Sequence, residues 1–173
     1  MTFRAPLCDR CILQRVRIAE PIDGTHRAAP FAAVIVDYPS EDDLEEGRLL
    51  SGRGGNLFQQ ALDGVGVQRS RLDIVTALAC RPRDGNMKRV DAQHRMTLRA
   101  QEVQGVPENQ RLLHPMIACR PRLLSEIERT TNVVAAGSIA LQSLALDKMP
   151  PVDSAQGNIL DLMCADGVAR KVI

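Results

Sequence analysis

Aromatic residues are scarce in this chain, which has one Tyr, three Phe and no Trp among its 173 residues. A hydrophobic core must therefore be built mainly from aliphatic side chains. No apolar run approaches the roughly 18 residues of a membrane-spanning helix, and no charged segment followed by an apolar one opens the chain as in a secretory signal. We therefore expect a soluble, cytoplasmic protein. Its length predicts one domain that buries roughly 70% of the unfolded surface.

An excess of charge is also missing, because 22 basic and 21 acidic residues leave a net charge of +1. This balance provides no bulk attraction to nucleic acid. Charge is nevertheless uneven along the chain. Residues 41–46 read EDDLEE, and we interpret this acidic run as part of a solvated loop over 41–55. It would repel phosphates, which favours a protein partner or a scaffold role.

Short apolar runs predict the strands. The unbroken run at 32–36 is typical of a strand buried on both faces, as in a parallel sheet. Similar runs predict strands at 72–78 and 132–136. Residues 157–162 and 168–173 flank an Asp-Gly turn and predict a β-hairpin.

Between these strands, apolar residues recur at helical spacing. They predict helices over 57–65, 116–130 and 139–146, the last of them N-capped by Ser138. The polar segment 84–113 has little periodicity, and we interpret it as an insertion that is partly helical. Strands that alternate with helices predict an α/β sandwich.

Five cysteines, an odd number spread over the chain, favour metal binding over a secreted disulfide framework. Cys8 and Cys11 form a C-x2-C pair, while Cys80 and Cys119 each stand in the sequence A-C-R-P. Four such thiols suit an iron–sulfur cluster or a structural Zn²⁺ ion. Unconnected thiols are the third alternative. Cys164 has no spacing that ties it to the others, and we expect it in the core.

The order of several short motifs resembles that of the family 4 uracil-DNA glycosylases, the iron–sulfur branch of that superfamily, from Cys8 to the end of the chain. Each motif alone is weak, but their order around four cysteines is fairly specific. The matching segments are CDRC at 8–11, VDYPS at 36–40, GRLLSGRGG at 47–55, IVTALACRP at 74–82, CRPRLLSEI at 119–127 and AGSIA at 136–140.

The resemblance implies a three-layer sandwich with a central, mainly parallel sheet. It also implies a [4Fe-4S] cluster, with Zn as the alternative, held by the family's four cysteines, here Cys8, Cys11, Cys80 and Cys119. The whole chain, 1–173, would be a single domain of this type.

The base pocket departs from the family pattern. The catalytic carboxylate position holds Asp37, the position of the stacking Phe holds Leu50, and that of the base-reading Asn holds Thr76. The sequence ends at Ile173, before the late H-P-S motif whose His stabilises charge on the departing base. The resemblance therefore implies an eroded pocket.

Backbone groups near two helix starts are further candidates for substrate contacts. Gly52, Arg53 and Gly55 could cradle a phosphate, although a tight turn explains the glycines nearly as well. Ser138 could hold a phosphate in the same way. Arginines nominated for DNA phosphates or for offsetting the cluster charge are Arg48, Arg53, Arg81, Arg83, Arg120 and Arg122.

Three functions follow from the resemblance. The first is an iron–sulfur glycosylase-like domain that acts in DNA association or architecture during replication or repair. The second is an active uracil-DNA glycosylase that uses Asp37. The third is a structural scaffold that does not bind DNA. Related domains are also joined to phage-type DNA polymerases, so we expect a fused polymerase or a separate protein partner as an alternative context. We expect no association with a membrane.

Overall fold

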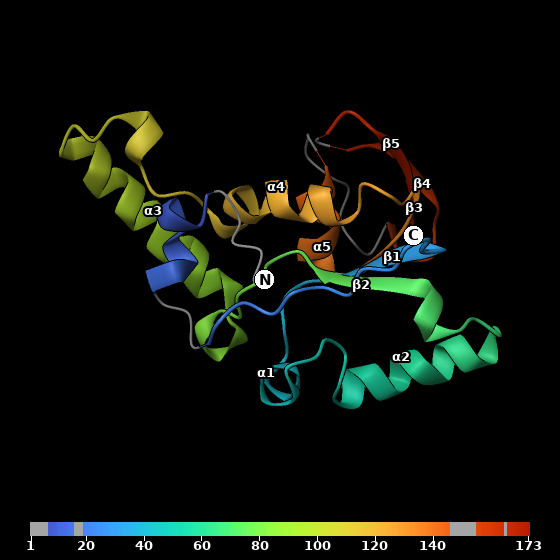
Figure 1. Ribbon diagram of the computed structural model, residues 1–173. Coiled ribbons are helices and arrows are strands. Elements are labelled where there is room, and N and C mark those ends of the chain that lie inside the picture. The colour runs from blue at the N-terminus through green and yellow to red at the C-terminus, as the bar shows by residue number, and fades with distance from the viewer. Residues whose placement is uncertain (1–6, 16–18, 146–154, 165) are drawn as a thin grey trace.

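A five-stranded sheet forms the centre of the computed structural model, which describes residues 7–15, 19–145, 155–164 and 166–173 (Figure 1). The strand order is β2-β1-β3-β5-β4. β1 pairs in parallel with β2 and β3, β3 pairs in parallel with β5, and β4 runs antiparallel to β5. The strands are β1 (Ala32–Val36), β2 (Leu72–Thr76), β3 (Asn132–Ala136), β4 (Leu160–Met163) and β5 (Ala169–Val172).

Helices cover both faces of this sheet. On one face, α4 (Pro115–Glu126) and α5 (Ser138–Leu144) pack against a core that includes Ala33 and Ile35 of β1. On the other, α2 (Arg53–Gly64) packs against Ala32 and Val34 of the same strand. Successive side chains of a strand point to opposite faces, so β1 contributes to both cores. The predicted α/β sandwich with a mainly parallel sheet is confirmed.

The acidic run is a helix, α1 (Glu41–Glu46), so its interpretation as a loop was wrong. Ser40 and Asp43 form a capping box in which each side chain accepts a hydrogen bond from the other residue's backbone N–H. Acidic residues in the first turn also interact favourably with the helix dipole. These end effects stabilise a helix that has little hydrophobic periodicity.

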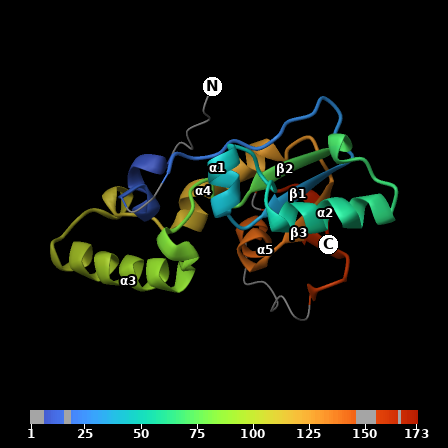
Figure 2. The same cartoon turned by 90° about the horizontal axis from the view of Figure 1, so that it is seen from below.

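The segment 84–113 consists largely of α3 (Met87–Val103), preceded by the 3₁₀ segment η4 (Arg83–Gly85) and followed by η5 (Glu108–Gln110). Val90 is the buried residue of α3. Figures 1 and 2 show α3 well away from β4 and β5, beside the N-terminal 3₁₀ segments η1 (Cys8–Arg10) and η2 (Ile12–Arg15). A mostly polar helix of this kind leaves most of its surface exposed.

The ends of the predicted helices differ from the structure. α4 begins with Pro115 at a position where a missing N–H is tolerated, and it stops at Glu126. The N-cap of α5 is Gly137, whose positive φ of 138° favours glycine. No side chain at the N-cap position accepts a hydrogen bond from the first turn. The predicted capping role of Ser138 was therefore wrong. The predicted end of this helix at residue 146 lies outside the described residues.

Candidate functional site: the cysteine pole and the strand ends

Four cysteines come from three separate parts of the chain. Cys8 lies in η1 and Cys11 follows as its C-cap, Cys80 lies four residues beyond β2, and Cys119 lies within α4. The C-x2-C segment is attached to the chain before α4 by backbone hydrogen bonds. The N–H of Leu113 donates to the Arg10 carbonyl at 2.7 Å, and that of Ile12 donates to the Leu113 carbonyl at 3.3 Å.

Three of these thiols belong to one apolar cluster, with exposed fractions of 6% for Cys11, 9% for Cys80 and 5% for Cys119. Cys8 is half-buried. Cys164 lies instead in the core between the sheet and α4, as expected. None of the five cysteines forms a disulfide. We call the region of Cys8, Cys11, Cys80 and Cys119 the cysteine pole.

The thiols of the cysteine pole affect one another electrostatically. Burial raises the pKa of Cys11 to about 12, and the neighbouring Cys119 and Cys80 thiols add to this effect. Burial also raises the pKa of Cys119, with Cys8 acting in the same direction. All four thiols therefore lie within electrostatic range of another member.

The donor set fits an iron–sulfur cluster or Zn²⁺ chemically, because both take four thiolates. The arrangement of these side chains in space supports a metal site less clearly than their chemistry does. Among the described residues, no group of three or more His, Cys, Asp or Glu side chains is arranged to hold a metal ion. The structure thus gathers the predicted ligands at one pole but does not establish the cofactor.

A buried arginine connects the cysteine pole to the strand edge. Arg122 is 1% exposed, and its Nη1 donates to Glu126 Oε2 at 2.6 Å. Its Nη2 donates to the carbonyl oxygens of Thr76 and Ala77 at the end of β2. Its charge also favours the thiolate form of Cys119, which lowers the pKa of that thiol against the effect of burial. Arg122 is therefore excluded from contact with DNA.

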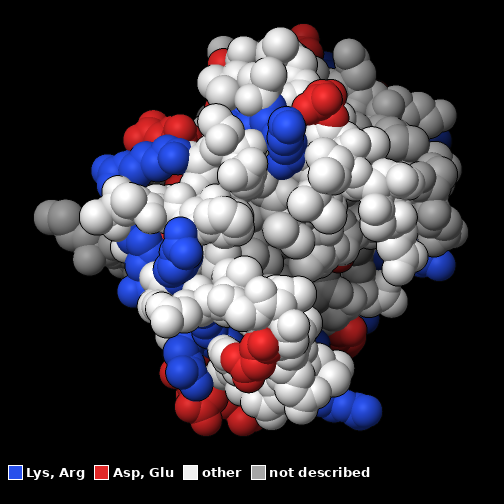
Figure 3. Space-filling view, turned by 90° about the vertical axis from the view of Figure 1, so that its right-hand side faces the viewer, with Lys and Arg blue, Asp and Glu red and all other residues white. Residues whose placement is uncertain are grey.

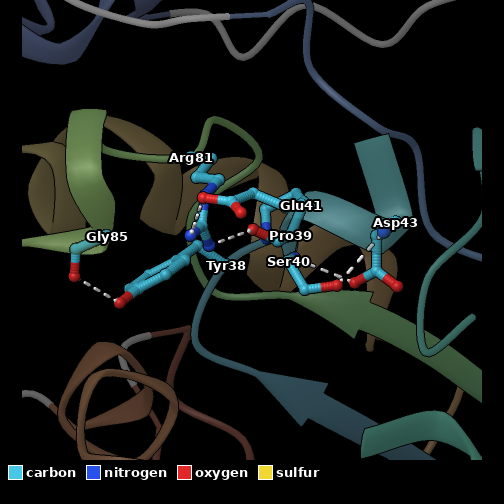
Figure 4. Close-up of polar contacts among 7 residues, drawn as sticks. All are labelled: Tyr38, Pro39, Ser40, Glu41, Asp43, Arg81 and Gly85. Carbon is cyan, nitrogen blue, oxygen red and sulfur yellow. Dashed lines mark hydrogen bonds and ion pairs between the residues drawn. The ribbon is translucent and has the colours of Figure 1, made fainter. Parts of the chain in front are cut away.

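Arg81, the arginine of the first A-C-R-P motif, is also engaged within the fold (Figure 4). Arg81 Nη1 donates to the Pro39 carbonyl at 3.2 Å, and Nη2 pairs with Glu41 Oε1 at 3.0 Å. The guanidinium lies 5.8 Å from the ring centroid of Tyr38, whose hydroxyl donates to the Gly85 carbonyl at 2.7 Å. These contacts hold the loop after β1 against the loop after β2. They leave Arg81 poorly placed for phosphate.

Asp37 follows β1 at the carboxyl edge of the parallel strands, where α/β proteins usually bind ligands. Its Oδ1 accepts the backbone N–H of Ala140 at 2.8 Å, so it caps α5 from a distant part of the chain. Burial raises the pKa of Asp37, while N–H groups of Ala140 and Ile139 oppose that shift. A Cβ on Gly137 would meet Asp37 Oδ1 at 2.2 Å, so glycine is required there.

The Asp37 region adjoins the cysteine pole. Strand pairing continues beyond β2, where the N–H of Leu78 donates to the Asp37 carbonyl at 2.9 Å. Leu78 itself belongs to the apolar cluster of the cysteine pole. The candidate base pocket and the candidate ligands are therefore close along the chain, because only Ala79 separates Leu78 from Cys80.

Thr76 ends β2 at this edge, whereas Leu50 lies in the segment between α1 and α2. Thr76 is fully buried, and its Oγ1 has no hydrogen-bond partner in the described structure. Leu50 is half-buried and adopts φ 53°, an unusual backbone conformation for a non-glycine residue. The guanidinium of Arg69 donates to the carbonyl oxygens of Leu49 at 2.8 Å and Leu50 at 3.2 Å. These bonds hold the strained residue in place.

Close contacts account for two glycines at the start of α2, with a side chain at Gly52 and with the backbone at Gly55. A Cβ on Gly52 would meet Asp42 Oδ2 at 1.6 Å, and one on Gly55 would meet the Leu50 carbonyl oxygen at 1.8 Å. Gly54 has no neighbour within 4 Å of such a Cβ. Arg53 is exposed at the start of α2 and remains available for a ligand. The tight-turn interpretation is therefore sufficient for Gly52 and Gly55.

Sequence reasoning missed the structural roles of Asp43 and Arg122, which organise this region. Asp43 Oδ1 accepts the N–H and hydroxyl of Ser51 at 2.8 and 2.9 Å, which ties α1 to the glycine-rich loop. Burial disfavours the Asp43 carboxylate, but hydrogen bonds from Ser51 and Ser40 outweigh it and lower its pKa. The S-x-x-D spacing from Ser40 could have indicated this role. The burial of Arg122 had no comparable signal.

No protein-family model matches the chain. A similar curated protein is the type-4 uracil-DNA glycosylase of Pyrobaculum aerophilum, which is 32% identical over 88 residues. The match covers 49% of this chain and 44% of that protein, so it spans less than half the length of the relative. Together with the α/β fold, this similarity supports a relationship to the uracil-DNA glycosylase superfamily. In the described part of the chain, no helix is long and apolar enough to cross a membrane.

Proposed function

We propose that the chain is an iron–sulfur, uracil-DNA glycosylase-like domain that associates with DNA during repair or replication and does not excise uracil efficiently. The observation that carries this proposal is the gathering of Cys8, Cys11, Cys80 and Cys119 at one pole of a glycosylase-like sheet. The similarity to a type-4 uracil-DNA glycosylase supports the same function. Domains of this kind are also joined to phage-type DNA polymerases. We therefore propose in addition that the chain acts within a larger assembly.

The four cysteine thiolates would hold a [4Fe-4S] cluster, with Zn²⁺ as the alternative. A bound cluster supplies cross-links between distant segments, and its ligation energy adds to the free energy of folding. Two features of the protein would help the cysteines to hold a cluster. The backbone pairing of Leu113 fixes the C-x2-C segment, and Arg122 places a positive charge beside Cys119.

Three features of the strand edge argue against efficient uracil release. Asp37 already accepts a hydrogen bond from the first turn of α5, and Thr76 is fully buried. Leu50 has no aromatic face, although base stacking on an aromatic side chain contributes about 1–3 kcal/mol. A base that leaves the DNA stack would therefore find weak stacking and no exposed amide to read its edge.

An active glycosylase is the second candidate, and the observation that favours it is the position of Asp37. A half-buried carboxylate with a raised pKa at the carboxyl edge of a parallel sheet is typical of catalytic sites. The two candidates differ in what Asp37 does. In the first it positions α5, and in the second it also assists departure of the base.

Excision of uracil from a labelled oligonucleotide, followed by alkaline cleavage of abasic sites, distinguishes the two. We expect no multiple turnover by the unmodified protein, and binding that is no stronger for the uracil strand than for a matched thymine strand. Multiple turnover that Asp37→Asn abolishes, with the melting temperature preserved, would establish the active glycosylase instead. A protein that binds no DNA under any salt condition would favour a scaffold.

A further inference from the structure

A cavity of about 240 Å³ between α3, η4 and η2 is lined by three arginines, two amides and one valine. The residues that line it are Arg15, Arg83, Asn86, Arg89, Val90 and Gln93. No acidic side chain is among them. Three guanidinium groups around one cavity have no structural reason to gather there, since like charges repel at short distance.

The charges of this cavity are largely uncompensated within the described residues. Arg15 and Arg83 are exposed and form no ion pair with a described acidic residue. Arg89 Nη1 pairs with Asp84 Oδ2 at 3.2 Å, but both side chains are about two-thirds exposed. Such an exposed surface pair contributes little to stability. An incoming anion could therefore displace it.

The amide of Asn86 complements these cations. Its Oδ1 accepts the backbone N–H of Arg89 at 3.2 Å as the N-cap of α3. Because this hydrogen bond directs the amide oxygen of Asn86 toward the helix backbone, its NH₂ group remains available as a donor. Planar guanidinium groups and amide N–H donors together match the oxygens of a phosphate.

A second group of cations lies on another side of the same helix. Lys88, Arg95 and Arg99 are exposed and lie at spacings of seven and four residues, which places them on one side of α3. At 3.6 residues per turn, this side is about 100–160° around the helix axis from Arg89, Val90 and Gln93, which line the cavity. These cations therefore do not extend the cavity. The acidic residues Asp91 and Glu102 of α3 are engaged with His114 and Arg111.

We propose that this cavity, which we call the α3 basic surface, binds a phosphate of the phosphodiester backbone of a nucleic acid. The inference rests on the proposed DNA association and gives it a location outside the predicted base pocket. Figure 3 shows the side of the molecule that bears β4 and β5 in Figure 1, and basic and acidic side chains are mixed on it. The α3 basic surface instead has three arginines and no acidic side chain in its lining. Contacts of this kind provide affinity without base specificity.

Fluorescence anisotropy with a short labelled single strand, at several salt concentrations, tests this inference. The cavity variant is Arg15→Ala with Arg83→Ala, and the matched control is Arg129→Ala with Lys171→Ala, which removes the same charge from exposed positions elsewhere. We expect the cavity variant to lose about tenfold in affinity at low salt. The slope of log affinity against log salt should fall by about 1.4, or 0.7 for each lost contact. The control should stay within about twofold.

Each alternative has its own result. If the unmodified chain binds DNA and the cavity variant binds it equally well, the α3 basic surface is overturned while the proposed function stands. If the unmodified chain binds no DNA, the proposed function fails as well. If inorganic phosphate at constant ionic strength occupies the cavity as tightly as the oligonucleotide does, the ligand is a small anion and the nucleic-acid assignment is overturned.

A second comparison variant removes the cations on the other side of α3. Lys88→Ala with Arg95→Ala and Arg99→Ala should reduce the affinity and the salt slope less than the cavity variant does, although it removes one more charge. A loss as large as that of the cavity variant would overturn the cavity as the binding site. All these side chains are exposed, so the melting temperatures should remain close to that of the unmodified protein.

Discussion

Gly54→Ala and Gly55→Ala add the same methyl group at adjacent positions in the first turn of α2, yet we expect opposite effects on stability. At Gly54 the new Cβ has no neighbour within 4 Å. The substitution should therefore stabilise the protein by about 0.5 kcal/mol, because alanine loses less backbone entropy than glycine in a helix. At Gly55 the new Cβ would lie 1.8 Å from the Leu50 carbonyl oxygen.

This clash requires backbone movement. Ordinary contact starts near 3.4 Å, so α2 and Leu50 have to separate by about 1.6 Å. The Leu50 carbonyl also accepts hydrogen bonds from Arg69, and Ser51 is held by Asp43. Overpacking costs about 1–3 kcal/mol, and a weakened hydrogen bond adds about 1 kcal/mol. We expect a total destabilisation of about 3 kcal/mol.

Thermal and denaturant unfolding followed by circular dichroism measure both effects. For a domain of this size, 1 kcal/mol corresponds to about 2–4 °C in Tm. Gly55→Ala should therefore lower the Tm by roughly 10 °C, while Gly54→Ala should raise it by about 1–2 °C. Equal melting temperatures for the two variants would refute the close approach of α2 to Leu50. Gly54→Ala should also leave DNA affinity unchanged if the loop is a turn and not a phosphate cradle.

Three further predictions follow from other parts of the structure. In the protein purified without oxygen, Cys119→Ser should lower the Tm far more than Cys164→Ser, because only the first removes a proposed ligand; equal losses would contradict the ligand set. Asp37→Ala should destabilise by about 1 kcal/mol through loss of the cap on α5, whereas Asp37→Asn keeps an acceptor oxygen and should cost little. Hydrogen bonds from Arg170 lower the pKa of Asp166 below 3.8, so their stabilisation is present above that pH and is lost as pH falls through the folded-state pKa. Asp166→Asn should therefore unfold at lower urea at pH 7 but match the unmodified protein in strong acid.

The parallel strands could be predicted from the sequence because of their apolar runs, and β1 and β2 are buried on both faces. β1 and β3 occupy the same residues as the apolar runs at 32–36 and 132–136, and β2 ends two residues before its predicted end at 78. An unbroken run of Val, Ile and Ala is enough to indicate such a strand. The hairpin of β4 and β5 also formed around its Asp-Gly turn.

Helix α1 could not be found by hydrophobic periodicity because its stabilising interactions are at its ends. Asp43 is a buried residue of α1, and it is buried as a hydrogen-bonded carboxylate. The first turn carries Glu41 and Asp42 in addition, which favours the helix electrostatically. The composition of this run resembles that of a solvated loop, so only the cap signature separates the two structures.

The spacing of the cysteines predicts a shared site, and this ligand set stays a prediction, whereas the surroundings of the cysteines had no signal in the sequence. A C-x2-C pair and a cysteine beyond a strand end indicate a shared site whichever helix completes it. The sequence contains no comparable signal for Arg122, because its partners at the end of β2 lie 46 residues away. Long-range contacts of that kind depend on how α4 packs on the sheet. Such contacts engage Arg122 and Arg81 within the fold, whereas the α3 basic surface stays available to bind an anion.

Iron and acid-labile sulfide content of the protein purified without oxygen, read together with its visible absorbance, tests the central claim most directly. We expect a brown protein with about four iron and four sulfide per chain, a broad visible band bleached by dithionite, and loss of both in Cys80→Ser. The control Cys164→Ser should retain the iron and the colour. A colourless protein with about one zinc per chain would contradict the cluster, and an absence of any bound metal would contradict the ligand set itself.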